Sequence, residues 1–81
     1  MNKDVAREII RASFRSEREL ENLIGFLKER CGPNDYKELV RSIAIAIDGI
    51  NVELVKKALT MFPDLKLEME SNLKRTGQVM P

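Results

Sequence analysis

The sequence predicts an all-α protein: a compact, bundle-like domain of four to five helices around a central apolar helix at about residues 34–48. Three observations lead to this prediction. Apolar residues recur at helical spacing, helix-capping and helix-breaking residues separate the spaced segments, and the central segment is apolar on more than one side. Every predicted connection is short, so consecutive helices are expected to pack as neighbours in one domain spanning residues 1–77.

The central helix is predicted from apolar residues spaced three or four apart between Tyr36 and Ile47. Alternating isoleucines in the same stretch also fit a strand, but the helical series is longer than the usual strand of about five to six residues. It is too short for a bilayer span, which needs about 20 apolar residues. The helix begins with either Pro33 as its first residue or Asn34 as its cap. Ile43 and Ile47 are expected to be nearly fully buried.

The N-terminal third of the chain is predicted to form two helices, the first from Asp4 to about Arg15. Ser16 and Glu19 have the spacing of a capping box, in which the serine accepts from a backbone N–H and the glutamate reaches back to the serine's own N–H. A second helix is therefore predicted to begin at Ser16. It ends before Gly32, because glycine suits the left-handed position after a helix and the proline that follows cannot continue the ladder.

A fourth helix is predicted directly after the central one. Gly49 is expected to stop the central helix, and Asn51 is expected to cap the next. Ile50 and Val55 have the spacing of a hydrophobic staple, which fixes the entry of the chain into a helix. The connection between these two helices is therefore predicted to be a very short turn.

The last helix is predicted from Asp64 to about Thr76. Pro63 forces a break before it, since the residue that precedes a proline avoids the helical region. Gly77 is expected to end the helix in the left-handed conformation. Residues 78–81 then form a frayed C-terminal tail.

The composition argues against an enzyme. The sequence has no histidine, which removes histidine acid–base chemistry, serine–histidine triads and almost every common zinc site. Cys31 is the only cysteine, and it is expected to be a small apolar residue and not a nucleophile. Glu17, Glu19 and Glu21 are two residues apart, so they point in different directions on a helix. No catalytic, cofactor-binding or metal-binding residue is assigned.

Arg7, Arg11 and Arg15 are spaced four apart and form a basic stripe on the first helix. Guanidinium groups hold carboxylates or phosphates with two hydrogen bonds, so the basic stripe is a candidate contact for an acidic protein surface or for nucleic acid. The alternative is a solvated face on which Asp4 pairs with Arg7, Glu8 pairs with Arg11 and Arg15 pairs with Glu19. Such pairs are routine on helices, so we expect the solvated face.

Residues 39–62 also allow a helix-turn-helix interpretation, because two predicted helices meet at a glycine-containing turn. The first turn of the second helix is poor for reading bases, since it carries Glu53 and no basic side chain before Lys56. Because of the basic stripe and this pair of helices, a nucleic-acid-binding regulator is the alternative function, although it is less favoured. It requires the basic stripe to merge with Lys56 and Lys57 into one surface.

The favoured function is a small non-enzymatic protein–protein interaction module that self-associates in the cytoplasm. A chain of 81 residues has an unfavourable surface-to-volume ratio, and its net charge of +1 gives little repulsion between copies. Phe26, Ile45 and Leu67 lie off the main apolar faces of their helices, and Phe26, beside Gly25, is an expected contact. A single cysteine fits a reducing compartment, and the N-terminal residues do not have the pattern of a secretory signal. Neither a membrane nor a small-molecule ligand is expected as a partner.

Overall fold

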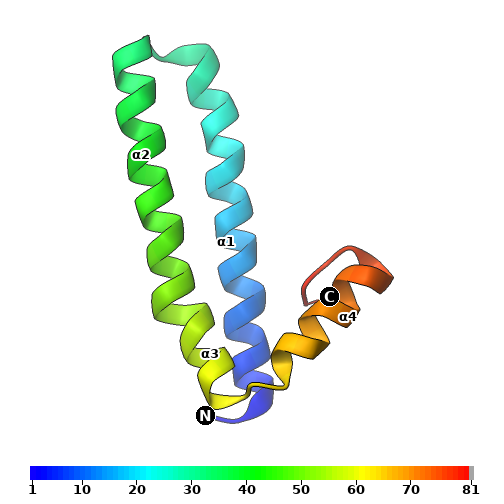
Figure 1. Cartoon of the computed structure of the whole chain (residues 1–81). Coiled ribbons are helices and arrows are strands. Elements are labelled where there is room, and N and C mark those ends of the chain that lie inside the picture. The colour runs from blue at the N-terminus through cyan, green and yellow to red at the C-terminus, as the bar shows by residue number, and fades with distance from the viewer. Residues whose placement is uncertain (81) are drawn as a thin grey trace.

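The computed structural model describes residues 1–80, and within them it contains helices and no strand (Figure 1). The elements are α1 (Lys3–Arg30), α2 (Pro33–Ile50), the π-helical segment η1 (Asn51–Val55), α3 (Lys56–Met61) and α4 (Leu65–Thr76). α2, η1 and α3 follow one another without a break and form one continuous rod. Together with α1 and α4, residues 1–80 therefore form three helical rods. The all-α prediction is confirmed, whereas the bundle of four to five helices is wrong.

α1 is one helix where two were predicted, so the boundary at Ser16 is wrong. The Ser16 hydroxyl donates to the carbonyl of Ala12, 2.8 Å away, as a serine does in a helix interior, and it caps no new helix. Residues 3–24 include no glycine or proline and many strong helix formers, which favours continuation. The cap of α1 is Asn2, whose side chain accepts from the backbone N–H of Val5.

The turn predicted at Gly49 is absent, because the helix continues through it into η1. Asn51 has the right-handed helical conformation, with φ −64° and ψ −46°, so it is not an N-cap. The backbone N–H of Lys56 donates to the carbonyl of Asn51, which is the five-residue spacing of a π-helix. Ile50 and Val55 are also five residues apart, a spacing that fits a π-turn as well as it fits a hydrophobic staple.

The core lies at the end of the molecule where the N-terminus and α4 meet, and not around residues 34–48 (Figure 1). Its buried side chains come from α1, α3, α4 and the segment after α4, and they are Ala6, Ile10, Ala58, Leu65 and Met80. In α2 only Ile43 is buried, and Ile47 is half-buried although it was expected to be nearly fully buried. The central role predicted for α2 is therefore wrong, because α1 covers it on one side only.

α4 ends at Gly77 as predicted, with a positive φ of 76° that favours glycine. The segment after it folds back onto the core, where a frayed tail was predicted. The Asn72 side chain donates to the carbonyl of Val79 at 2.9 Å, and Met80 is buried. The frayed tail is therefore wrong for residues 78–80, and Pro81 lies outside the described residues.

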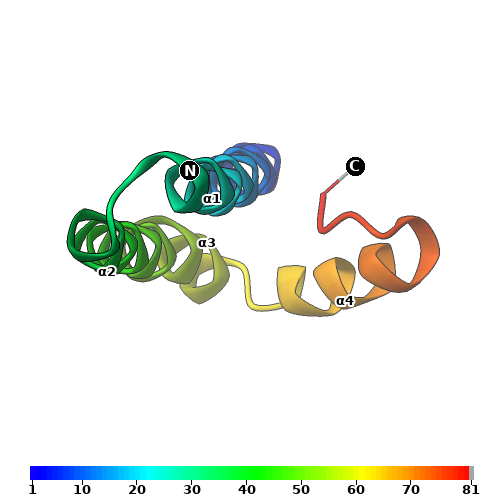
Figure 2. The same cartoon turned by 90° about the horizontal axis from the view of Figure 1, so that it is seen from above.

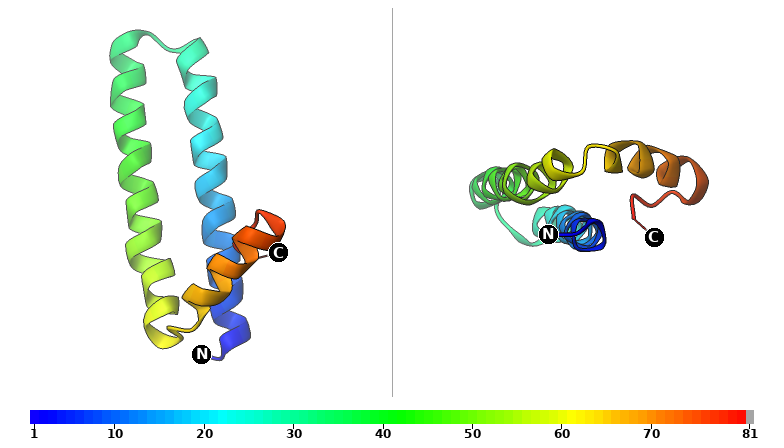
Figure 3. Two further views of the ribbon diagram at one scale, coloured as in Figure 1. Left: turned by 45° about the vertical axis from the view of Figure 1, so that its right-hand side comes forward. Right: turned by 90° about the horizontal axis from the view of Figure 1, so that it is seen from below.

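The molecule is an elongated hairpin. α1 runs antiparallel to the continuous rod of α2, η1 and α3, and α4 lies to one side near the N-terminal end (Figure 2). The principal extents are 44 × 25 × 15 Å, and the Cα radius of gyration of 14.9 Å exceeds the roughly 12 Å of a compact chain of this length. The half of the hairpin near the α1–α2 connection therefore consists of two helices alone (Figure 3). No helix within residues 1–80 is long and apolar enough to cross a bilayer.

Candidate interaction surface

On one side of the hairpin each rod carries a series of uncharged side chains, bordered by Glu8 and Glu19 on α1 and by Asp35 on α2. On α1 these residues are spaced three or four apart, so they share one helical face: Val5, Ile9, Ala12, Ser16, Leu20, Leu23 and Leu27. The rod of α2, η1 and α3 contributes a second series: Leu39, Ser42, Ala46, Gly49, Leu54 and Met61. We call these two series together the open face.

The two series lie on the same side of the hairpin, and α4 lies on the other. Both rods are right-handed helices that run antiparallel, and each series is rotated in the same sense from the residues that face the other rod. Arg7, which pairs with Glu68 of α4, is two residues from both Val5 and Ile9. At 100° per residue, it therefore lies on the opposite side of α1 from them. The open face is therefore left uncovered by the rest of the described chain.

The large side chains of the open face are poorly covered. Exposures of 39–52% are found for Val5, Leu23, Leu39, Leu54 and Met61. Half-buried residues of the same series are Ile9, Leu20 and Leu27. Since a pair of helices covers one stripe on each helix, the apolar residues beside that stripe remain in contact with water. A contiguous apolar surface of this kind on a folded protein marks an interaction site.

Small residues occupy the middle of the open face, and we call them the waist: Ala12, Ser16, Ala46 and Gly49. At 1.5 Å per residue all four lie roughly 20–27 Å from the α1–α2 connection. A Cβ added at Gly49 meets no other described part of the chain within 4 Å, so residues 1–80 leave this space open. The face therefore has large apolar side chains at both ends and a shallow region between them.

The accessible surface of the chain is larger than its mass predicts. It measures 5930 Å², whereas a compact monomer of 9.3 kDa exposes about 5,000 Å². The excess of about 900 Å² is close to the roughly 800 Å² that each partner buries in a standard protein–protein interface. The uncovered surface is thus large enough for a stable interface.

Phe26, the predicted contact, lies at the edge of the open face. It is 50% exposed and follows Leu23 by three residues on α1. The guanidinium carbon of Arg30 lies 4.4 Å from the centroid of its ring, a cation–π contact that covers one side of the aromatic group. A Cβ added at Gly25 meets no other described part of the chain within 4 Å, so no segment of this chain approaches the backbone there.

The N-terminal part of the basic stripe forms ion pairs within α1 and with α4. The Arg7 Nε donates to the Glu68 carboxylate at 2.9 Å, and its Nη1 donates to Asp4 at 2.7 Å. Hydrogen bonding to Glu68 raises the pKa of Arg7, although desolvation opposes this. Lys3 pairs with Asp64, and this hydrogen bond lowers the pKa of the Asp64 carboxyl. These pairs join α1 to α4 and to the residue before it, so Arg7 has a structural role.

The rest of the basic stripe is more open. Arg11 pairs with Glu8, so the predicted pairs between Asp4 and Arg7 and between Glu8 and Arg11 are both confirmed. Arg15 is exposed and has no hydrogen bond or ion pair within residues 1–80, so its predicted pair with Glu19 is wrong. Only this last arginine of the predicted site is therefore free to meet a partner.

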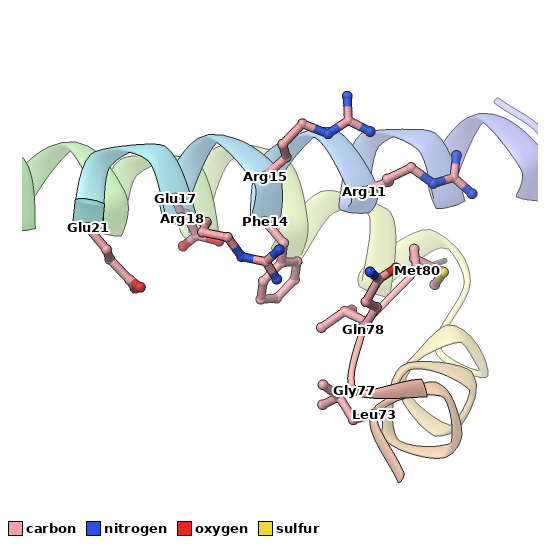
Figure 4. Close-up of a pocket in the computed structure, with 11 residues that line it drawn as sticks. Arg11, Phe14, Arg15, Glu17, Arg18, Glu21, Leu73, Gly77, Gln78 and Met80 are labelled. Carbon is pink, nitrogen blue, oxygen red and sulfur yellow. The ribbon is translucent and has the colours of Figure 1, made fainter. Parts of the chain in front are cut away.

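A cleft of about 450 Å³ separates α1 from the segment after α4 (Figure 4). Its lining includes Arg11, Arg15 and Arg18, and Arg18 points into it while Arg15 points away. Apolar lining residues are Phe14, Leu73, Val79 and Met80. Glu17 and Glu21 line the same cleft, so its charge is mixed and does not favour an anion.

Lys56 and Lys57 line a different cleft of about 320 Å³ along α3. This cleft shares no lining residue with the cleft beside the arginines. Lys57 also pairs with Glu53 at 3.4 Å. Arg11 and Arg15 therefore do not line the same cleft as the two lysines.

A buried carboxyl group at Glu17 was missed in the sequence analysis. Glu17 is 6% exposed, and neither its Oε2 nor the Ser13 Oγ one turn earlier has a hydrogen-bond partner within residues 1–80. Burial raises the pKa of Glu17, a hydrogen bond from Asn51 lowers it, and the nearby Glu21 raises it. The signal in the sequence was its helical spacing from three other buried residues of α1, which are Ala6, Ile10 and Ser13.

Within residues 1–80 no three histidine, cysteine, aspartate or glutamate side chains are grouped as a metal site would need. No protein-family model matches the sequence, and no curated protein or solved structure matches it either.

Proposed function

We propose that this protein is a small, non-enzymatic protein–protein interaction module that self-associates through its open face. The observation that supports this proposal is the exposure of 39–52% for five large apolar side chains of that face. The series on α1 from Val5 to Leu27 consists of uncharged residues, and the exposed Glu8 and Glu19 lie at its border. Exposed apolar surface is stabilised when another apolar surface covers it.

A second copy of the chain suits this face well. The excess surface matches what one partner of a standard interface buries. Two hairpins that stack on their open faces place four helices around a shared apolar core, which is the arrangement of a four-helix bundle. The net charge of +1 also gives little electrostatic opposition to self-association.

The nucleic-acid alternative has weaker support. Arg7 and Arg11 already have acidic partners, which reduces the positive charge available to phosphates. α2 continues into η1 without the turn that a helix-turn-helix motif needs.

Sedimentation equilibrium at micromolar concentrations tests the proposal. Leu23→Glu places a carboxylate in the open face, and Leu67→Glu is the matched control because Leu67 is 70% exposed on α4. We expect twice the chain mass for wild type and the control, and a single-chain mass for Leu23→Glu, since an unpaired buried charge costs several kcal/mol. Circular dichroism should show equal helix content in all three proteins.

A wild-type mass of one chain throughout the micromolar range would contradict self-association. Titration of the same samples with duplex DNA and with single-stranded RNA at physiological salt addresses the alternative. Tight nucleic-acid binding by a monomeric wild-type protein would replace the proposed function with the alternative one.

A further inference from the structure

We infer that the cleft between α1 and the segment after α4 binds a small zwitterion, namely a free α-amino acid with an apolar side chain. The cleft has a volume of about 450 Å³, which lies within the roughly 300–1,000 Å³ of small-molecule sites. It lies on the side of the hairpin that carries α4, away from the open face. The inference therefore does not depend on self-association.

Glu17 offers an acceptor for a cation in this cleft. The residue lines the cleft and is 6% exposed, and its Oε2 has no hydrogen-bond partner within residues 1–80. Figure 4 shows its carboxyl group on the side of α1 that carries Phe14 and Arg18. The terminal torsion of a glutamate is broad, so Oε2 can turn toward the cleft within a favoured rotamer. A buried acceptor without a donor is costly, and an ammonium group supplies three donors.

Two further charges complete the polar end of the cleft. Glu21 lies four residues after Glu17 on the same face of α1, where like charges repel each other and favour a cation. Arg18 points into the cleft (Figure 4). Neither Arg18 nor Glu21 has a hydrogen bond or ion pair within residues 1–80. Because a guanidinium group binds a carboxylate with two parallel hydrogen bonds, the polar end can hold both an ammonium and a carboxylate group.

The opposite wall of the cleft is largely apolar. It includes Leu73 of α4 and Val79 and Met80 of the segment after it, and Phe14 of α1 lines the cleft as well. An α-amino acid carries its ammonium group, its carboxylate and its side chain on one carbon atom. It can therefore use both charges at the polar end while its side chain contacts the apolar wall. Only the fold brings residues 14–21 and 73–80 together, so no small-molecule ligand was expected from the sequence.

Isothermal titration calorimetry at neutral pH with three matched ligands tests the inference. L-Phenylalanine has both charged groups, 2-phenylethylamine has only the ammonium group, and 3-phenylpropanoate has only the carboxylate. We expect saturable binding of phenylalanine and at least about tenfold weaker binding of the other two, since each lacks one charge-assisted contact. No saturable binding of phenylalanine at millimolar concentrations would overturn the inference. Equally tight binding of either other ligand would overturn the zwitterionic ligand.

Two pairs of variants test whether the bound molecule lies in this cleft. Arg18→Gln and Glu17→Gln each remove one charge that lines the cleft, and Glu17→Gln keeps the side-chain volume. The matched controls are Arg41→Gln and Glu29→Gln, which remove exposed charges outside the cleft. We expect the first two to weaken phenylalanine binding at least about tenfold and the controls to match wild type.

Circular dichroism of the same variants should show the helix content of wild type, so that a loss of binding reports on the cleft and not on folding. Equal phenylalanine affinities of a cleft variant and its control would overturn the site. Sedimentation equilibrium should give the wild-type mass for all four variants, because the cleft and the open face lie on different sides of the hairpin. Failure of self-association and failure of ligand binding are therefore observed separately.

Discussion

The buried carboxyl group of Glu17 lowers the stability of the folded protein near neutral pH. Its carboxyl group is held between α1 and η1 with 6% of its surface exposed, and its Oε2 has no partner within residues 1–80. Burial disfavours the charged form, so the pKa of Glu17 is raised in the folded state. Folding therefore takes up protons at this site, and its contribution becomes less favourable as the pH rises from the ordinary glutamate value of about 4.3 through the raised folded pKa.

We expect Glu17→Gln to stabilise the protein by roughly 1 kcal/mol near neutral pH, because it removes a poorly solvated charge and keeps the side-chain volume. The gain should vanish at a pH below about 4, where the carboxyl is protonated in both the folded and the unfolded chain. Urea unfolding at both pH values measures this, with the exposed Glu29→Gln as a control. A variant less stable than wild type near pH 7 would mean that the Asn51 hydrogen bond outweighs burial.

At the scale of elements, periodicity identified which segments are helical but not where they are interrupted. The Ser-x-x-Glu pattern at Ser16 occurs at helix starts and in helix interiors, because serine bonds either to an N–H ahead or to the carbonyl four residues earlier. The five-residue interval from Ile50 to Val55 is equally ambiguous. Gly77 was predicted correctly because its positive φ favours glycine, whereas Gly49 inside a helix costs only about 1 kcal/mol, which packing offsets.

The same distinction between glycines predicts opposite stability changes. Gly25→Ala should stabilise the protein by about 1 kcal/mol, since it lies inside α1 and the added Cβ meets nothing within 4 Å. Gly77→Ala should destabilise it by about 1–2 kcal/mol, because its φ of 76° disfavours a side chain although the surrounding space is open. Chemical denaturation of the two variants measures both signs. Equal changes would show that α4 does not end in the left-handed conformation.

At the scale of the whole molecule, the residues of the open face can be found in the sequence, but the sequence does not show what covers them. The uncharged series from Val5 to Leu27 has the period of a buried stripe, and a stripe does not say whether its cover comes from the same chain. The contact between Arg7 and Glu68 could not be predicted from the sequence, because it joins residues that are 61 positions apart. Two of the three local pairs predicted within α1 are present, since helix geometry brings such residues together, but Arg15 does not pair with Glu19.

The consequence for the molecule is an uneven distribution of stability. Fully buried side chains gather around Ala6, Ile10 and Leu65, while among residues 20–47 only Ile43 is buried. Regions with few buried apolar contacts open locally at low free energy. The half of the hairpin near the α1–α2 connection should therefore gain the most from a covering partner.

Amide hydrogen exchange at two protein concentrations tests this account most directly, because its central claim is that a second copy covers the open face. Raising the concentration from low micromolar to several hundred micromolar should slow exchange in residues 20–47 by at least about tenfold, since the dimer closes the local openings. Exchange in α4, on the other side of the hairpin, should change much less. Exchange rates in residues 20–47 that do not depend on concentration would contradict the account.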